Sequence, residues 1–187
     1  QVKHIYAWLP LMAWEFPKRY KLSYVSHSAG GKQGYIRVSP FDPQNLKYVS
    51  EIYLDFMQSN SVDGILYHDD VTLSDYEDSS NIAKKMYQSW GFNSDQLLKQ
   101  SKHPKPSQLA KFKTAYLDQF AEGISKIIKQ QQPNMLTARN MYAPVVLDPK
   151  VKIGLASLCL APINTMTTMP SWPCRIWKRQ MIINNSI

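Results

Sequence analysis

The sequence has no acidic residue after Asp148, and this absence sets its last part apart from the rest. All fourteen acidic residues precede residue 150, whereas residues 151–187 carry four basic ones, which is half of the net charge of +8. The remaining charge is spread along residues 1–150 without a basic stripe. The composition therefore argues against a nucleic-acid partner, even though the chain is basic.

Cysteine, long apolar runs and phosphate-binding loops are also scarce or absent. The chain has two cysteines, Cys159 and Cys174, which we interpret as free thiols because one pair gives little support for a disulfide or a metal site. No apolar run is long enough to cross a bilayer. Since no charged and apolar leader follows Gln1, we expect any export signal to lie upstream. No glycine-rich loop follows a predicted strand, and we expect no cofactor.

Short apolar segments typical of strands alternate with helical patterns. Asp42-Pro43 predicts a helix start, because a carboxylate caps the first turn and proline fits its first position. The expected strands span residues 4–9, 35–38, 62–67 and 135–142, and the expected helices begin near residues 43, 80 and 107. We expect the apolar stripe of the third helix to be buried: Leu109, Phe112, Tyr116, Phe120, Ile124, Ile127 and Ile128.

Alternation of strand and helix predicts the α/β class, with a parallel sheet and crossover helices. About four strands are half of an eight-stranded barrel, so we expect a partial (β/α)8 barrel of the TIM type within residues 1–150. An open doubly wound sheet is the alternative architecture.

Carboxylates gather where the third predicted strand ends. Six of them lie between Asp63 and Asp78, and His68-Asp69-Asp70 directly follows the strand. The carboxyl ends of barrel strands carry active sites in this architecture. Glycoside hydrolysis needs one carboxylic acid and a second group that acts as base or nucleophile, so Asp69 and Asp70 are candidate catalytic residues. The alternatives are a capped loop, a solvated turn before a helix, or a metal site, for which one histidine is weak evidence.

Aromatic residues near the strand ends could form a platform for sugar rings. The candidates are Trp8, Trp14, Tyr67, Tyr76 and Tyr142, and Arg139 could bind sugar hydroxyls or hold an acid in place. Packing in the core or rim is the alternative for each aromatic residue, and a structural ion pair is the alternative for Arg139.

Five strings resemble the C-terminal domain of the PgaB/HmsF family, the poly-β-1,6-N-acetyl-D-glucosamine N-deacetylases of Gram-negative bacteria. HDD within residues 63–70 and SDYED within residues 73–78 are specific in combination, and residues 6–10, 39–43 and 138–143 support them. The resemblance covers residues 2 to 150 and leaves out the metal-dependent deacetylase domain.

The resemblance implies a (β/α) barrel that binds and cleaves the partly deacetylated polymer. It implies a periplasmic protein attached to the outer membrane, which works with an export porin. It also implies that Asp69 is the catalytic acid, while Asp70, Asp75 and Glu77 line an acidic groove suited to protonated amines. The expected substrate-binding residues are His68, Asp75, Glu77, Trp8, Trp14, Tyr67, Arg139 and Tyr142.

Residues 151–187 depart from the family pattern. If the reading frame is shifted, Met166-Thr167 must encode Asp and Trp177-Lys178 must encode Glu, and allowed choices elsewhere give a family-like strand. We therefore hypothesise a frameshift near residues 150–152, so that the tail is not part of the native fold. On this interpretation the chain lacks half of a barrel and is expected to be inactive. A non-catalytic module that holds the cationic polymer is the alternative function.

Overall fold

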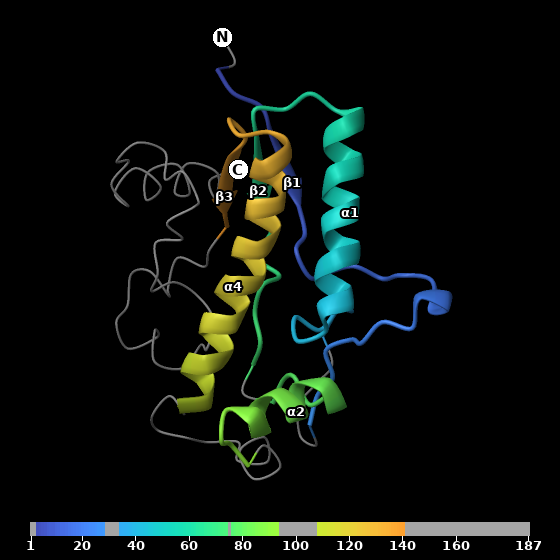
Figure 1. Ribbon diagram of the computed structural model, residues 1–187, viewed down its shortest axis with the longest axis vertical. Helices are drawn as coiled ribbons and strands as arrows, with labels where there is room; N and C mark the ends of the chain where they lie inside the picture. Colours follow the sequence, from blue (N-terminus) through green and yellow to red (C-terminus); the bar gives the residue numbers. More distant parts are fainter. Residues whose placement is uncertain (1–2, 29–33, 75, 94–107, 141–187) are drawn as a thin grey trace, which may run out of the picture.

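The computed structural model describes residues 3–28, 34–74, 76–93 and 108–140. The elements in chain order are listed here with their bounds: β1 (Tyr6–Leu9), the 3-10 helix η1 (Lys18–Tyr20), α1 (Pro43–Ser59), β2 (Gly64–Tyr67), α2 (Asn81–Ser89), α4 (Gln108–Gln131) and β3 (Leu136–Arg139) (Figure 1). The α/β class predicted from the sequence is confirmed.

The described strands form one parallel sheet in the order β1-β2-β3. Leu9 is in register with Tyr67, and Tyr67 with Arg139, so all three strands end at the same edge. This parallel sheet was predicted. Its three described strands do not by themselves form a closed barrel, and the barrel therefore stays a prediction for the parent protein.

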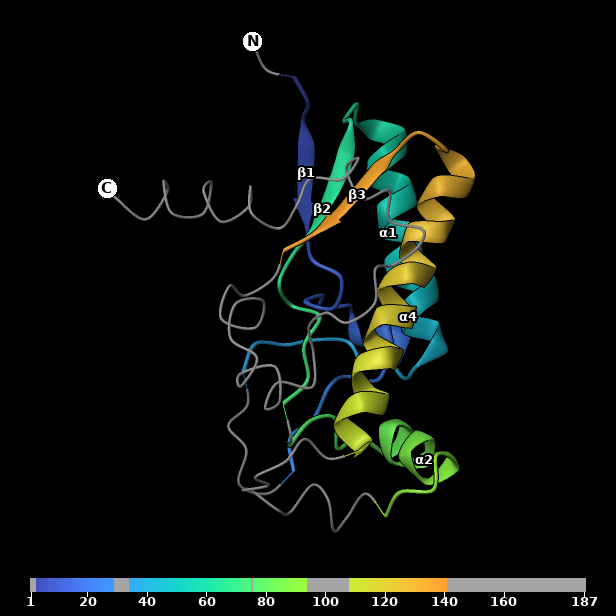
Figure 2. The same cartoon turned by 90° about the vertical axis from the view of Figure 1, so that its left-hand side faces the viewer.

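Helices α1 and α4 lie side by side on one face of the sheet, and α2 lies beyond the carboxyl ends of the strands (Figure 2). The core fills the space between the sheet and these helices. Ile65 and Tyr67 enter it from the sheet, Tyr53 from α1, and Leu117 and Ile124 from α4. Because strand residues alternate between faces, the neighbours of Ile65 and Tyr67 point to the face that these helices leave open.

The predicted helix starts are confirmed. Asp42 caps α1, its side chain accepting a hydrogen bond of 3.0 Å from the backbone N–H of Gln44, and proline is the first helical residue. Ser80 caps α2 by accepting from the N–H of Ala83. The buried stripe of α4 is correct in its main part, but Phe112 is 45% exposed because it lies at the rim, against Trp90.

The strand predicted over residues 35–38 is wrong. Val38 forms one antiparallel bridge with Tyr24, and the rest of the segment is a loop. Arg37, which alternation would place on a strand face, instead turns inward and is buried. A run of four residues is too short for the sequence pattern to distinguish a strand from a loop that forms a single bridge with another loop.

The proposed tail at residues 151–187 lies outside the described residues, as do the last two residues of the strand predicted to end at residue 142. Among the described helices, none combines the length and apolar character that a bilayer crossing requires.

Candidate functional site

The candidate site lies on the open face of the sheet, at the carboxyl ends of β1 and β2. Trp8 is 59% exposed and stacks on His68, with ring centroids 4.8 Å apart and planes inclined by 20°. His68 continues the direction of β2, since its backbone N–H donates to the carbonyl of Leu9. Both rings therefore belong to the sheet face opposite α1 and α4.

Asp69 lies beside this stack. Its Oδ1 is 2.7 Å from Nδ1 of His68, and the side chains of His68 and Asp69 are 39% and 23% exposed. A half-buried carboxylate, an imidazole and an exposed indole thus share one edge of the sheet. The carboxylate can exchange a proton with a bound molecule, and the indole offers an apolar face of the kind that packs against a sugar ring.

Asp70 points the other way and is fully buried. Its carboxylate accepts backbone hydrogen bonds from Leu11 at 3.2 Å, from Met12 at 2.6 Å and from Ala13 at 2.6 Å. A fully buried carboxylate that accepts three backbone N–H groups is out of reach of a substrate. The expectation that Asp70 is catalytic or lines a groove does not fit this burial, and its role is to tie the end of β2 to the loop after β1.

Tyr67 and Arg139 face the helices rather than the open face. The hydroxyl of Tyr67 lies 2.8 Å from that of Ser125 on α4, and burial raises the pKa of this tyrosine. Arg139 is paired with Asp118 of α4 at 2.9 Å and donates to the carbonyl of Val71 at 2.9 Å. The structural ion pair considered for Arg139 is therefore the correct alternative, and neither residue reaches a sugar on the open face.

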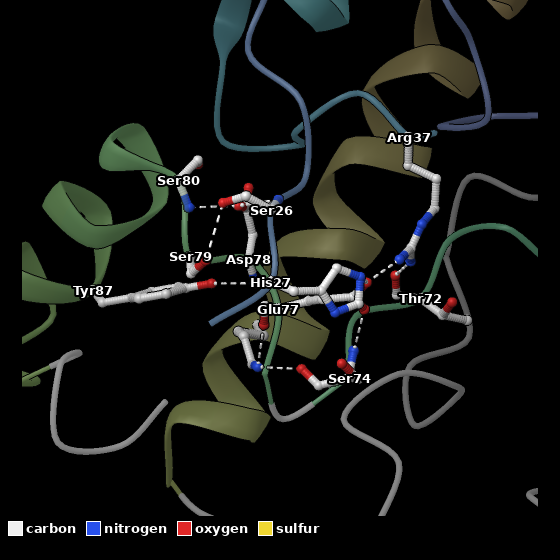
Figure 3. A network of polar contacts seen from close by, with 11 residues as sticks. Ser26, His27, Arg37, Thr72, Ser74, Glu77, Asp78, Ser79, Ser80 and Tyr87 are labelled. Atoms are coloured by element: carbon white, nitrogen blue, oxygen red, sulfur yellow. Dashed lines mark hydrogen bonds and ion pairs between the residues drawn. The ribbon is translucent and has the colours of Figure 1, made fainter. Parts of the chain in front are cut away.

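Glu77 is buried in a polar network that Figure 3 shows from close by. Its Oε1 pairs with the guanidinium of Arg37 and lies 2.7 Å from Nε2 of His27. Its Oε2 accepts from the backbone N–H of Ser74 at 2.8 Å. The expectation that Glu77 lines an open groove is wrong for the same reason as for Asp70, because both carboxylate oxygens are occupied by protein groups.

Asp78 continues the network and is fully buried. Its oxygens accept from the backbone N–H groups of Ser26 and Ser80 and from the hydroxyl of Ser39. Its own N–H donates to the hydroxyl of Tyr87, as Figure 3 shows. Asp78 thus fixes the start of α2 to the loop around residue 26.

The remaining candidates are placed as follows. Trp14 is partly buried and packs against the core, which favours the packing alternative. Asp75 and Tyr142 lie outside the described residues, so their roles stay predictions. Within the described ranges, no group of three or more histidine, cysteine, aspartate or glutamate residues could hold a metal ion.

Sequence reasoning missed the buried charged partners of this region. Arg37 and Lys113 are buried and contact the segment that follows β2. Asp118 is mostly buried and pairs with Arg139, which donates to the same segment. Lys113 stands in the apolar stripe of α4, one residue after Phe112, and a lysine at such a position was the available signal. A buried lysine needs polar partners, which a sequence pattern alone does not identify.

Comparison with known proteins gives consistent matches. The family model described as "Hypothetical glycosyl hydrolase family 13" matches residues 1–162. The poly-β-1,6-N-acetyl-D-glucosamine N-deacetylases of Escherichia coli strains K12 and O157:H7 are each 36% identical over 162 residues, which is 82% of this chain and 24% of theirs. The chain therefore spans about a quarter of the length of the curated relatives that it matches.

A solved structure matches as well. The PgaB (BpsB) glycoside hydrolase domain from Bordetella bronchiseptica aligns with a TM-score of 0.68 and 34% identity, over 82% of this chain and 46% of that one. The described elements thus share the arrangement of just under half of that domain.

Proposed function

Because this chain belongs to the family described as hypothetical glycosyl hydrolase family 13, we propose that it is part of a protein that binds and hydrolyses partly deacetylated poly-β-1,6-N-acetyl-D-glucosamine. The names of its relatives in Escherichia coli and Bordetella bronchiseptica support the polymer and the type of reaction. The parent protein would work in the periplasm at the outer membrane, next to an export porin, as the family resemblance implies.

The observation that carries the proposal is the group of Trp8, His68 and Asp69 on the open face of the sheet. Trp8 presents an exposed indole, and Asp69 places a carboxylate beside it at the strand ends. A sugar stacked on the indole would bring a glycosidic oxygen near the carboxyl group. Asp69 would then act as the acid that protonates the leaving oxygen.

His68 would position this acid. Its Nδ1 lies 2.7 Å from Oδ1 of Asp69, close enough for an ion pair but without the geometry of a hydrogen bond, while its ring rests on Trp8. The contact links the orientation of the carboxyl group to the platform that holds the sugar. Asp70, the second catalytic candidate of the sequence, is buried, and Asp75 stays a predicted substrate-binding residue.

The test separates hydrolysis from binding alone. Residues 1–150 of this chain are joined to the remaining half of the Bordetella bronchiseptica hydrolase domain, and the chimera is incubated with β-1,6-linked glucosamine oligomers. Asp69→Asn should abolish the release of shorter oligomers, detected by mass spectrometry, and should leave oligomer binding largely intact. The buried Asp70→Asn variant reports on folding alone.

The competing function is a binding module for the cationic polymer. It predicts that the chimera binds the oligomers, and that neither the unsubstituted chimera nor its Asp69→Asn form shortens them. Cleavage that is unchanged in Asp69→Asn would remove Asp69 from the mechanism while leaving a hydrolase.

A further inference from the structure

The last residue pair between β1 and β2 lies directly behind the aromatic platform of the candidate site. Leu9 and Tyr67 form this pair, and both pack toward the helices. Trp8 and His68 are their neighbours in sequence and therefore project to the opposite face, where their rings stack. A group that contacts Leu9 and Tyr67 from the helix side thus supports the platform from behind.

Tyr53 of α1 makes these contacts. It is fully buried, and its ring meets the ring of Tyr67 edge to face, with the centroids 5.9 Å apart. Its hydroxyl donates to the carbonyl of Pro10 at 2.9 Å and, in a longer contact of 3.4 Å, to the carbonyl of Leu9. One side chain of α1 therefore contacts the carboxyl ends of both strands.

The carbonyl of Leu9 connects both halves of the platform to Tyr53. It accepts the backbone N–H of His68 at 2.9 Å, in addition to the hydroxyl of Tyr53. Trp8 is the residue just before this carbonyl group, and His68 is bonded to it. The direction of one peptide carbonyl thus affects the placement of both stacked residues.

Tyr53 and Asp70 bind complementary backbone groups of residues 9–13. The carboxylate of Asp70 accepts from the three N–H groups of residues 11–13, whereas Tyr53 donates to the two carbonyls just before them. Burial raises the pKa of Tyr53, and the nearby Tyr67 and Asp70 raise it further, so the hydroxyl stays protonated and acts as a donor. The loop after β1 is therefore held through both its donors and its acceptors.

Filling the core does not by itself account for the hydroxyl of Tyr53. Phenylalanine would fill the same space without a buried polar atom, and one buried hydrogen bond adds only modestly to stability once the lost contacts with water are counted. A hydroxyl that donates to a backbone carbonyl also fixes the direction of that carbonyl, which an apolar ring cannot do. The carbonyls of Leu9 and Pro10 lie immediately after Trp8, where this direction bears on the platform.

We propose that Tyr53 is a positioning residue, which holds the end of β1 from the helix side so that Trp8 stays stacked on His68 and faces the polymer. The inference rests on the proposed function for its ligand, an oligomer of β-1,6-linked glucosamine. It adds to the site a buried residue that does not touch the polymer and acts through the backbone of Leu9 and Pro10.

The experiment uses the full chain and needs no cleavage. Tyr53→Phe removes the hydroxyl and keeps the ring. Tyr67→Phe is the matched control, because it makes the same change in the same core, but its hydroxyl meets Ser125 of α4. Amide hydrogen exchange is followed at His68, and affinity for a short β-1,6-linked glucosamine oligomer is measured by calorimetry. The Tyr53→Phe change is also made in a Trp8→Ala background, which closes a double-mutant cycle.

In Tyr53→Phe, exchange of the His68 amide should accelerate by about tenfold or more, while the amides of α4 keep their rates. Oligomer affinity should fall about fivefold, because the platform is no longer preorganised for the sugar. In the Trp8→Ala background the same change should alter affinity by less than about twofold, since the ring through which Tyr53 acts is gone. Tyr67→Phe should change neither the exchange of His68 nor the affinity.

Unchanged exchange of His68 or unchanged affinity in Tyr53→Phe would overturn the proposal. An equal loss of affinity in the Trp8→Ala background or in Tyr67→Phe would also overturn it, because the effect would then not pass through Trp8. A wild-type chain that binds no oligomer would overturn the binding part of the proposed function together with this inference. That result is recognisable in the wild type alone, whereas a failure of the positioning role appears only when the variants are compared.

Discussion

The carboxylate of Asp70, at the end of β2, accepts a hydrogen bond of 2.6 Å from the backbone N–H of Met12, which follows β1. Leu11 and Ala13 donate to the same carboxylate. The loop after β1 is therefore shaped around one buried charge, next to an aspartate of very different exposure. The two adjacent carboxylates divide their roles, one holding the backbone and the other facing the site.

Asp70→Asn should destabilise the fold by about 2–4 kcal/mol, because an amide offers one acceptor oxygen and turns its own N–H groups toward backbone donors. Asp69→Asn, whose side chain is partly exposed, should change the free energy of unfolding by less than about 1 kcal/mol. Urea unfolding followed by circular dichroism checks both. Equal losses in the two variants would contradict the division of roles.

Local signals in the sequence predicted the frame of this structure well. Three features depend only on residues that are neighbours in the sequence, and a sequence pattern can therefore predict them. They are the Asp42-Pro43 cap, the alternation of strands and helices, and the strand that ends before His68. Strand alternation could have done more, since residues 67 and 68 must point to opposite faces. Applying it would have kept His68 at the site and assigned Tyr67 to the core.

The partners of Glu77 could not be predicted in this way. Arg37 is 40 residues away in sequence, and nothing local marks it as the cation that meets this carboxylate. The crowding of carboxylates between Asp63 and Asp78 suggested an acidic groove, but three of them are buried and bonded to protein groups, namely Asp70, Glu77 and Asp78. Only three-dimensional placement separates a carboxylate that binds a ligand from one that holds a loop.

Gly64 at the start of β2 should not tolerate a side chain. A Cβ there would lie 2.4 Å from Cε1 of Tyr6 and 2.9 Å from the carbonyl oxygen of Leu136, which is backbone and cannot rotate away. Gly64→Ala should cost about 1–3 kcal/mol in the free energy of unfolding, through overpacking between β1 and β3. Gly34→Ala is the control, because a Cβ at that position has no neighbour within 4 Å, and it should be neutral or slightly stabilising. Thermal or urea unfolding of both variants decides the point.

Buried tyrosines should make the fold sensitive to alkaline pH. Burial raises the pKa of Tyr53, Tyr67 and Tyr87, in each case as the largest cause. Since their pKa is higher in the folded state, these tyrosines stabilise the fold while they are protonated. Their contribution to the free energy of unfolding is fully present below pH 10, about where an unfolded tyrosine ionises, and is lost as the pH rises above it. The free energy of unfolding should fall by up to about 4 kcal/mol per pH unit in that range.

The measurement is urea unfolding at a series of alkaline pH values, with phenolate absorbance recorded in parallel. The phenolate signal of the buried tyrosines should appear together with loss of the fold. Tyr53→Phe removes one of the three groups and should reduce the slope by about 1.4 kcal/mol per pH unit. A slope unchanged in Tyr53→Phe would show that another group dominates the alkaline transition.

Trp8 should contribute to ligand binding far more than to folding. Its side chain is 59% exposed and leaves the core intact when it is removed. Trp8→Ala should therefore lower the free energy of unfolding by no more than about 1 kcal/mol. The same change should weaken binding of a β-1,6-linked glucosamine oligomer about tenfold, or about 1.4 kcal/mol, because the sugar loses its flat apolar partner.

Two further variants show whether the platform is the cause. Trp8→Phe keeps a flat ring over His68 and should recover part of the affinity. Ile5→Ala removes an exposed apolar side chain just before β1, at the opposite edge of the sheet, and should leave affinity unchanged. Calorimetric titration of the three variants measures the effect. If Ile5→Ala weakened binding as much as Trp8→Ala, the oligomer would contact exposed apolar side chains in general. The carboxyl edge of the sheet would then not be its specific binding site.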